Sequence, residues 1–241
     1  MKRYLLKSGP ALLLIITGIM PFWTHDVTAE EGRIVPPTSG KIPVAVVLTE
    51  QANLIDFAGP WEVFTSVQVK GRGNSKNMDT PEDDQYPFFV YTVGQSRSPI
   101  QAGLNLTVVP QYTFDNAPSP AVVVVGAQRG SPGLKTWLLK VFADSRTHVI
   151  MSVCTGAFRL ASAGLLDKKP ATTHHAFYNE FEKYFPNVEL KKDRRYVRSD
   201  EKIFTAGGLT SGIDLALHVV ELYFGKQTAD QTAEWLEHRR S

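Results

Sequence analysis

A series of short, continuous apolar runs is the feature that most constrains what this chain can fold into. Each run is rich in β-branched residues and ends in glycine or polar residues, as strands buried on both faces of a sheet do. The runs cover residues 42–48, 88–93, 121–125 and 148–153, and the predicted helices cover residues 58–67, 133–143, 155–163, 177–185 and 211–225. Strands that alternate with helices predict an α/β fold with a mostly parallel sheet and helices on both faces.

Shorter elements are expected between these strands and helices. Residues 99–109 have the pattern of a hairpin, and residues 67–86 are polar enough to form a surface insertion. Ser211 and Asp214 have the spacing of a capping box at the start of the long helix. The remaining predicted elements are short strands at 171–173, near Tyr196 and near Ile203, and a last helix that begins at Thr228.

Sheets of this kind bind ligands beyond the carboxyl ends of their parallel strands. Three loops of this chain leave predicted strand ends, and they carry Asp56, the segment 126–130 and Cys154. We therefore expect a ligand or active site where these three loops meet.

Residues 1–29 have the layout of a secretory signal peptide. A basic leader precedes an apolar run over residues 11–20, and the small residue Ala29 ends a polar segment that suits cleavage. The apolar run is shorter than the roughly 20 residues that a membrane-spanning helix needs. We expect export to the periplasm or the cell exterior after cleavage at Ala29, without stable membrane association. An uncleaved membrane anchor is the alternative.

Removal of this leader changes the charge of the chain. The full sequence has 26 basic and 24 acidic residues. Three basic residues and one acidic residue lie in the leader, which leaves 23 of each and no net charge. Because nucleic-acid binders show a basic excess, we expect no nucleic-acid partner. The mature chain is expected to have a flexible lead-in at residues 30–40 and a single domain at residues 41–241.

Cys154 is the only cysteine of the chain, so it cannot form an intramolecular disulfide. A strand runs directly into a helix at this residue, which forces a strained turn that projects the side chain above the sheet. Gly156 permits close approach of the backbone, and the amide of Thr155 can face an oxyanion. The positive end of the helix predicts a lowered thiol pKa. The alternative, a buried structural cysteine, fits the local sequence equally well.

Five segments resemble the ThiJ/PfpI superfamily, which is related to the class I glutamine amidotransferases. The resemblance spans about residues 42–225, and the five segments occur in the expected order. They are Leu54-Ile-Asp-Phe-Ala-Gly-Pro-Trp-Glu-Val-Phe64, Ser152-Val-Cys-Thr-Gly-Ala-Phe158, Leu160-Ala-Ser-Ala-Gly-Leu-Leu166, Ala171-Thr-Thr-His174 and Gly207-Gly-Leu-Thr-Ser-Gly-Ile-Asp214. Among the branches of the superfamily, the chain is most similar to the isonitrile hydratases and to the amidotransferase-like domain of AraC-type regulators.

The resemblance implies a flavodoxin-like three-layer sandwich with Cys154 as the nucleophile of a catalytic group that includes Asp56 and Thr155. Asp56 stands where isonitrile hydratases carry an essential aspartate. Next to a thiolate its pKa should be raised, so that it can hydrogen-bond to the sulfur or deliver a proton. The alternative role for Asp56 is an N-terminal cap of the following helix.

The chain also departs from the pattern of the superfamily. Proteolytic and glyoxalase-like relatives carry a histidine next to the nucleophile or near it, whereas Thr155 follows Cys154 in this chain. Gly126 is left as the only member of a glycine pair, and its N–H can still contribute to an oxyanion hole. His174 can reach the site across the sheet or serve as a structural histidine, whereas Gly208, with Thr210, is expected to form a pocket wall or a turn before the helix.

Two functions from different classes follow from the resemblance. One is a cysteine-dependent hydratase or lyase that acts on a small electrophilic molecule and resembles isonitrile hydratase. The other is an exported, non-catalytic module that binds or senses a small ligand. No cofactor or metal is expected, because the sequence lacks paired cysteines, His-x-x-x-His and a Walker loop. The end of the chain at Ser241 leaves no room for a DNA-binding domain, and a homodimer is a further expectation.

Overall fold

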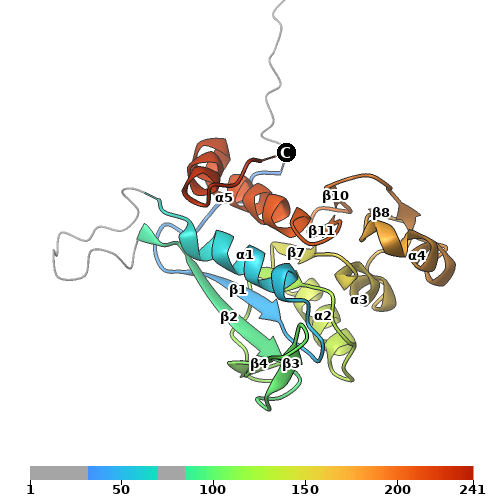
Figure 1. Ribbon diagram of the computed structural model, residues 1–241. Helices are drawn as coiled ribbons and strands as arrows, with labels where there is room; N and C mark the ends of the chain where they lie inside the picture. Colours follow the sequence, from blue (N-terminus) through green and yellow to red (C-terminus); the bar gives the residue numbers. More distant parts are fainter. Residues whose placement is uncertain (1–31, 70–84, 241) are drawn as a thin grey trace, which may run out of the picture. The chain divides into compact units, whose positions relative to one another are not determined.

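A seven-stranded sheet lies at the centre of the part of the chain that the computed structural model describes, residues 32–69 and 85–240 (Figure 1). Every neighbouring pair of strands is parallel except β10 and β11. Across the sheet the strands are β10 (Tyr196–Arg198), β11 (Ile203–Ala206), β7 (Val149–Ser152), β6 (Val122–Val125), β1 (Ile42–Val47), β2 (Phe88–Gly94) and β5 (Tyr112–Thr113). The four apolar runs therefore form β1, β2, β6 and β7, as predicted.

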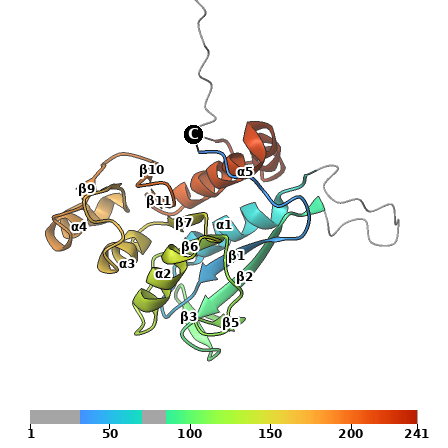
Figure 2. The same ribbon diagram turned by 180° about the vertical axis from the view of Figure 1, so that it is seen from behind.

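Helices cover both faces of the sheet, which gives three layers (Figures 1 and 2). One face carries α1 (Leu54–Ser66) and α5 (Ser211–Trp235), and the other carries α2 (Leu134–Ala143) and α3 (Gly156–Ser162). This arrangement explains why the strand sequences are apolar at most positions rather than at alternate positions. The prediction of a mostly parallel α/β sandwich is confirmed.

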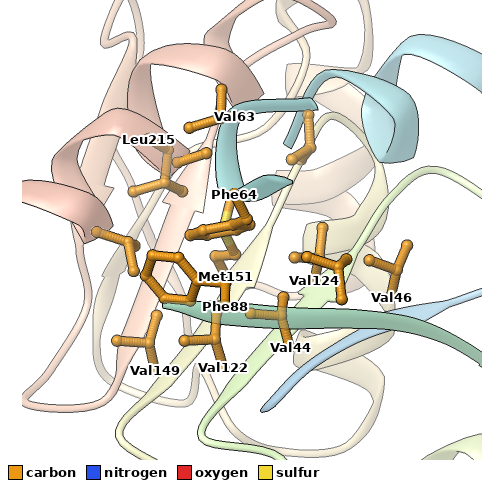
Figure 3. Close-up of a cluster of buried hydrophobic side chains, with 14 of the residues drawn as sticks. Val44, Val46, Val63, Phe64, Phe88, Val122, Val124, Val149, Met151 and Leu215 are labelled. Atoms are coloured by element: carbon orange, nitrogen blue, oxygen red, sulfur yellow. The ribbon is translucent and has the colours of Figure 1, made fainter. Parts of the chain in front are cut away.

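Successive residues of β1 show how the two cores are filled. Val44 and Val46 pack on the face of α1 and α5, whereas Ala45 and Val47 pack on the face of α2 and α3. All four are almost completely buried, and burial of a valine side chain contributes roughly 1.5–3 kcal/mol to stability. Figure 3 shows the first core, with Val63, Phe64, Phe88, Val122, Val124, Val149, Met151 and Leu215 around Val44 and Val46.

Helix α1 begins four residues earlier than the sequence predicts. It starts at Leu54, so that Pro60 lies in its interior, whereas a start at residue 58 would place Pro60 in the first turn. Phe57, in the first turn, packs against the core, so tertiary packing extends the helix despite the hydrogen bond that Pro60 cannot make. The consequence for function is that Asp56 lies inside the helix, in its first turn.

Helix α5 also differs from the sequence prediction at its start. Its N-cap is Thr210, and no side chain caps it. The predicted capping box of Ser211 and Asp214 is therefore wrong, because the Asp214 carboxylate bonds to Arg195 and His238 instead. The predicted break at Gly225 is present, since this residue has φ 81° and ψ 167°, and helical structure resumes directly after it rather than at Thr228.

Small elements surround the sheet. The predicted hairpin at 99–109 is present as two antiparallel strands, and a 3-10 turn leads into a helix where residues 177–185 were predicted to be helical. The bounds are β3 (Ile100–Ala102), β4 (Leu106–Val108), β8 (Pro170–Ala171), η2 (His175–Phe177), α4 (Tyr178–Tyr184) and β9 (Glu189–Leu190).

Several expectations fall on residues that the structure does not describe. The signal peptide at 1–29 and most of the surface insertion at 67–86 lie outside the described residues. The described part of the lead-in, residues 32–40, has no helix or strand, and the N–H of Ile34 donates to the Leu222 carbonyl at 2.8 Å. Within residues 32–69 and 85–240, no helix is both long and apolar enough to cross a membrane.

Candidate functional site

Cys154 occupies a tight elbow between β7 and α3. Its φ of 59° lies in the left-handed region, which is unusual for a residue with a side chain. Two backbone contacts hold the elbow. The Cys154 N–H donates to the Gly207 carbonyl at 2.7 Å, and the Thr173 hydroxyl donates to the Cys154 carbonyl at 2.9 Å. The predicted strained turn is confirmed, although the thiol is buried, with 5% of the residue exposed.

Gly156 lets the elbow approach the neighbouring strand. A Cβ atom at this position would lie 2.0 Å from the carbonyl oxygen of Val125 in β6, far closer than any contact between real atoms. Only glycine fits there, as the sequence analysis expected. The first residue of α3 therefore stands directly over the carboxyl end of β6, next to the loop that begins at Gly126.

Asp56 reaches the elbow from the first turn of α1. The residue is completely buried, and its Oδ2 accepts the Ala127 N–H at 2.9 Å. Gly126 allows this approach, because a Cβ there would lie 2.8 Å from the Cβ of Asp56. The carboxyl caps no N–H of its own helix, so its contacts do not support the capping role. Gly126 provides space for Asp56, a role different from the expected oxyanion donor.

The Asp56 carboxyl lies against the Cys154 thiol. Burial raises the pKa of Asp56 to about 6, and hydrogen bonds from the Ala127 N–H and the thiol oppose that rise. The other oxygen, Oδ1, is buried and has no hydrogen-bonding partner among the described residues. The direction of the predicted shift is confirmed, with burial rather than a neighbouring thiolate as its main cause.

The predicted lowering of the Cys154 pKa is wrong. Burial and the charge of Asp56 raise the pKa of the thiol to about 11, although the N–H groups of Thr155 and Leu209 lower it by hydrogen bonding to the sulfur. Desolvation and a nearby carboxylate outweigh the field of the short helix α3. At neutral pH the free protein therefore holds a protonated thiol beside an ionised carboxylate.

Leu209 is a site residue that the sequence analysis missed. It has a φ of 53°, and this conformation directs its N–H toward the Cys154 sulfur. The preceding residue, Gly208, packs against His174, since a Cβ there would lie 2.1 Å from the ring carbon Cδ2. Leu209 contributes its backbone N–H, which every residue except proline has, so its side-chain identity does not indicate this role. The sequence also gave no prediction of the Ala127 N–H as a donor to Asp56 or of the Thr173 hydroxyl as a donor to the Cys154 carbonyl. Thr173 lies in the Ala-Thr-Thr-His segment, which was the one signal that could have indicated it.

A cleft of about 430 Å³ opens beside Leu209. Its walls include His174, Gly208 and Thr210, which the sequence analysis had placed near the site. The Nδ1 atom of His174 accepts the Ala176 N–H at 3.2 Å, and burial lowers the pKa of the ring. The ring is thus neutral at pH 7 and faces Gly208. No hydrogen bond joins it to Cys154.

An ion pair between the buried Asp214 and the partly exposed Arg195 supports the wall of this cleft. The Asp214 side chain is 3% exposed and accepts Arg195 Nε at 2.7 Å and His238 Nε2 at 2.8 Å. The Thr210 hydroxyl accepts weaker bonds from the Arg195 guanidinium, at 3.3 and 3.4 Å. These contacts fix the start of α5, and with it the Gly208–Thr210 loop that faces the thiol.

The described residues contain no group of three or more His, Cys, Asp or Glu side chains that could hold a metal ion. The chemistry that the described site offers is therefore that of a thiol, a carboxyl and several backbone N–H groups. Such a set can add a nucleophile to a small electrophile and move one proton.

A mostly parallel α/β sheet, with a cysteine at the elbow between a strand and a helix and an acid from another helix beside it, defines the class of α/β protein to which this chain belongs. Within this class, residues 43–222 match the model of the DJ-1/PfpI family. The chain belongs to this family, and its fold is the flavodoxin-like fold of DJ-1.

Relatives of two kinds are similar to the chain. An isonitrile hydratase of Pseudomonas putida is 28% identical over 201 residues, which cover 82% of this chain and 78% of the relative. The transcriptional regulator GbdR of Pseudomonas aeruginosa is 27% identical over 154 residues, which cover 62% of this chain and 41% of the regulator. Among solved structures, a ThiJ/PfpI family protein of Pseudomonas syringae covers 95% of this chain, and 85% of that protein is covered, with a TM-score of 0.63 and 24% identity.

Proposed function

We propose that the protein is a cysteine-dependent hydratase that acts on a small electrophilic carbon compound, with isonitriles as the substrate class. The observation that carries this proposal is the buried pair of Cys154 and Asp56, in which the carboxyl has a pKa of about 6 and lies within hydrogen-bonding reach of the thiol. The similarity to an isonitrile hydratase supports the same chemistry.

In the proposed reaction Cys154 is the nucleophile and Asp56 carries the proton. Asp56 accepts the thiol proton as the sulfur of Cys154 bonds to the terminal carbon of R–NC, and the proton then passes to that carbon, giving the thioimidate R–N=CH–S–Cys. Water adds across the C=N bond, and the C–S bond breaks. The products are the formamide R–NH–CHO and the regenerated thiol. The N–H groups of Thr155 and Leu209 stabilise negative charge on the sulfur.

The test is turnover of a panel of alkyl isonitriles and α-oxoaldehydes, with the variant Cys154→Ala as control. We expect formamide with the intact protein and none above background with the variant. Lactate from methylglyoxal would move the assignment to a glyoxalase-like reaction. Absence of both products would contradict an enzymatic role for these substrates.

A second candidate, a module that binds a small ligand without turnover, is favoured by a different observation. The pKa of about 11 leaves Cys154 almost entirely as the thiol at neutral pH, and a thiol is a weak nucleophile until it loses its proton. The match to part of a transcriptional regulator fits this alternative. A panel compound that raises the Tm of the protein by mass action, without product, would support it.

The setting of this activity is proposed from the sequence. The leader at residues 1–29 supports export to the periplasm or cell exterior, with the mature protein free of the membrane. The partner is a small molecule rather than nucleic acid, and a homodimer is the proposed assembly. N-terminal sequencing of the exported protein should begin at Glu30, whereas an intact Met1 in the membrane fraction would indicate the anchor.

A further inference from the structure

Arg159, in α3, is a half-buried cation without a counter-ion among the described residues. Its Nε is buried and has no hydrogen-bonding partner in the described part of the chain. No described carboxylate forms an ion pair with its guanidinium, whose pKa is lowered by burial. Partly burying an unpaired charge destabilises a folded protein, and such charges are normally paired or hydrogen-bonded. Arg159 therefore lacks the partner that its position requires.

The surroundings of Arg159 are shaped to receive its guanidinium. Its Nη1 lies against Gly130, where a Cβ atom would come within 2.7 Å of it. Gly130 and Ser131 line a cleft of about 300 Å³ at the carboxyl ends of β1, β2 and β6. The hydroxyl of Ser131 is buried and also lacks a partner among the described residues. The cationic side chain of Arg159 and the hydroxyl of Ser131, which both have an unpaired hydrogen-bond donor, thus lie next to Gly130.

We propose that this corner, formed by Arg159, Gly130 and Ser131, binds the carboxylate group of a small molecule. One uncompensated positive charge matches a monoanion, and the guanidinium offers the paired donors that a carboxylate accepts. Glu50 and Arg129 line the same cleft, and their opposite charges offset each other. Arg159, which borders the cleft at Gly130, then adds one net positive charge, which matches a monoanion better than a dianion such as phosphate. The cleft is of the size that small ligands occupy. This inference does not depend on the chemistry of Cys154.

The proposal makes two opposite predictions for one substitution. Arg159→Met keeps the length of the side chain and removes the charge. Without any ligand the variant should be more stable, with a Tm higher by about 2–4 °C, because an unpaired charge has been replaced by an apolar group. Its affinity for a carboxylate should be weaker by about tenfold or more, because a charged hydrogen-bond donor has been lost.

The measurement is the Tm of the full-length protein in sodium chloride, sodium acetate and sodium phosphate at constant ionic strength. We expect acetate to raise the Tm saturably in the wild type. Gly130→Ala should weaken this effect as Arg159→Met does, because it displaces the guanidinium without removing its charge. The matched control is Arg97→Met, which removes an exposed arginine beside two cleft residues, Ser96 and Ser98, and should leave the response to acetate unchanged.

Several results would overturn the proposal. An acetate response that is absent in the wild type, or that survives in Arg159→Met, would show that the corner is not a carboxylate site. A response to phosphate without one to acetate would overturn the assignment of a monoanion. A lower Tm of Arg159→Met in chloride alone would show that the guanidinium already stabilises the fold, which contradicts an uncompensated charge.

Discussion

Asp56 and Cys154 share a site in which burial acts on both groups in the same direction. Burial disfavours each charged form, so the pKa of the acid is raised to about 6 and that of the thiol to about 11. The lone cysteine and the elbow could be predicted from sequence, because residue type and spacing encode them. The raised thiol pKa could not, because it depends on how deeply α1 and the Leu209 loop cover the sulfur.

The first prediction at this scale concerns the thiol. Asp56→Asn should lower the pKa of Cys154, because the substitution removes the charge that opposes thiolate formation. Iodoacetamide labelling followed from about pH 6 to about pH 10 measures this, relative to a free cysteine near 8.5. The wild-type rate should still be rising at the upper limit, and Asp115→Asn, which changes an exposed acid, should behave like the wild type. Equal curves for Asp56→Asn would show that the two groups do not interact.

The second prediction concerns stability. The pKa of Asp56 is raised in the folded state, from 3.8 to about 6, so the folded protein binds this proton more tightly than the unfolded chain. The ionised carboxyl therefore costs stability above pH 6, whereas the cost is absent below about pH 4. Asp56→Asn should raise the unfolding free energy by up to about 3 kcal/mol at pH 8 and change it little at pH 4. Urea denaturation at the two pH values tests this, and a loss of stability at pH 8 would contradict it.

At the scale of elements, the contact between α3 and β6 depends on Gly156. Gly156→Ala should destabilise the protein by about 3 kcal/mol, because the new Cβ collides with the Val125 carbonyl and the backbone must shift. Gly207→Ala is a comparison, since its Cβ would meet the Arg194 carbonyl at 3.3 Å, and its cost should stay near 1 kcal/mol. Equal unfolding midpoints for the two variants in chemical denaturation would show that the elbow tolerates a wider approach.

The long elements were predictable because periodicity and apolar runs reflect burial directly. β1, β2, β6 and β7 are buried on both faces, and their sequences show it. The start of α1 was missed because Pro60 suggests a first turn, whereas the packing of Phe57 decides where the helix begins. The capping box failed for a similar reason. Asp214 accepts hydrogen bonds from Arg195 and His238, which are distant in sequence, and no local pattern reveals these contacts.

At the scale of the whole molecule, Asp214 joins three distant parts of the chain: Arg195 before β10, the start of α5, and His238 after it. Asp214→Asn should destabilise the protein by about 1–3 kcal/mol, because it leaves a partly exposed arginine without its buried partner. Asp230→Asn, which alters a 44% exposed acid, should cost less than about 1 kcal/mol. Thermal unfolding of both variants measures this difference. Equal losses of stability would show that Asp214 contributes no more to stability than the exposed Asp230.

The packing of α5 against α1 also determines when this face of the sheet can be completed during synthesis. The ribosome makes α1 first, and the helix that covers the same face of the sheet follows about 150 residues later. At about 5–20 residues per second, that interval lasts on the order of 10 s. During this time the side chains of α1 that pack against α5 stay exposed to solvent. The site at Asp56 also lacks Cys154 and Leu209 until each of them has been made. A nascent chain of this length exposes apolar surface of the kind that chaperones cover, and its site is complete only after Leu209 has been made.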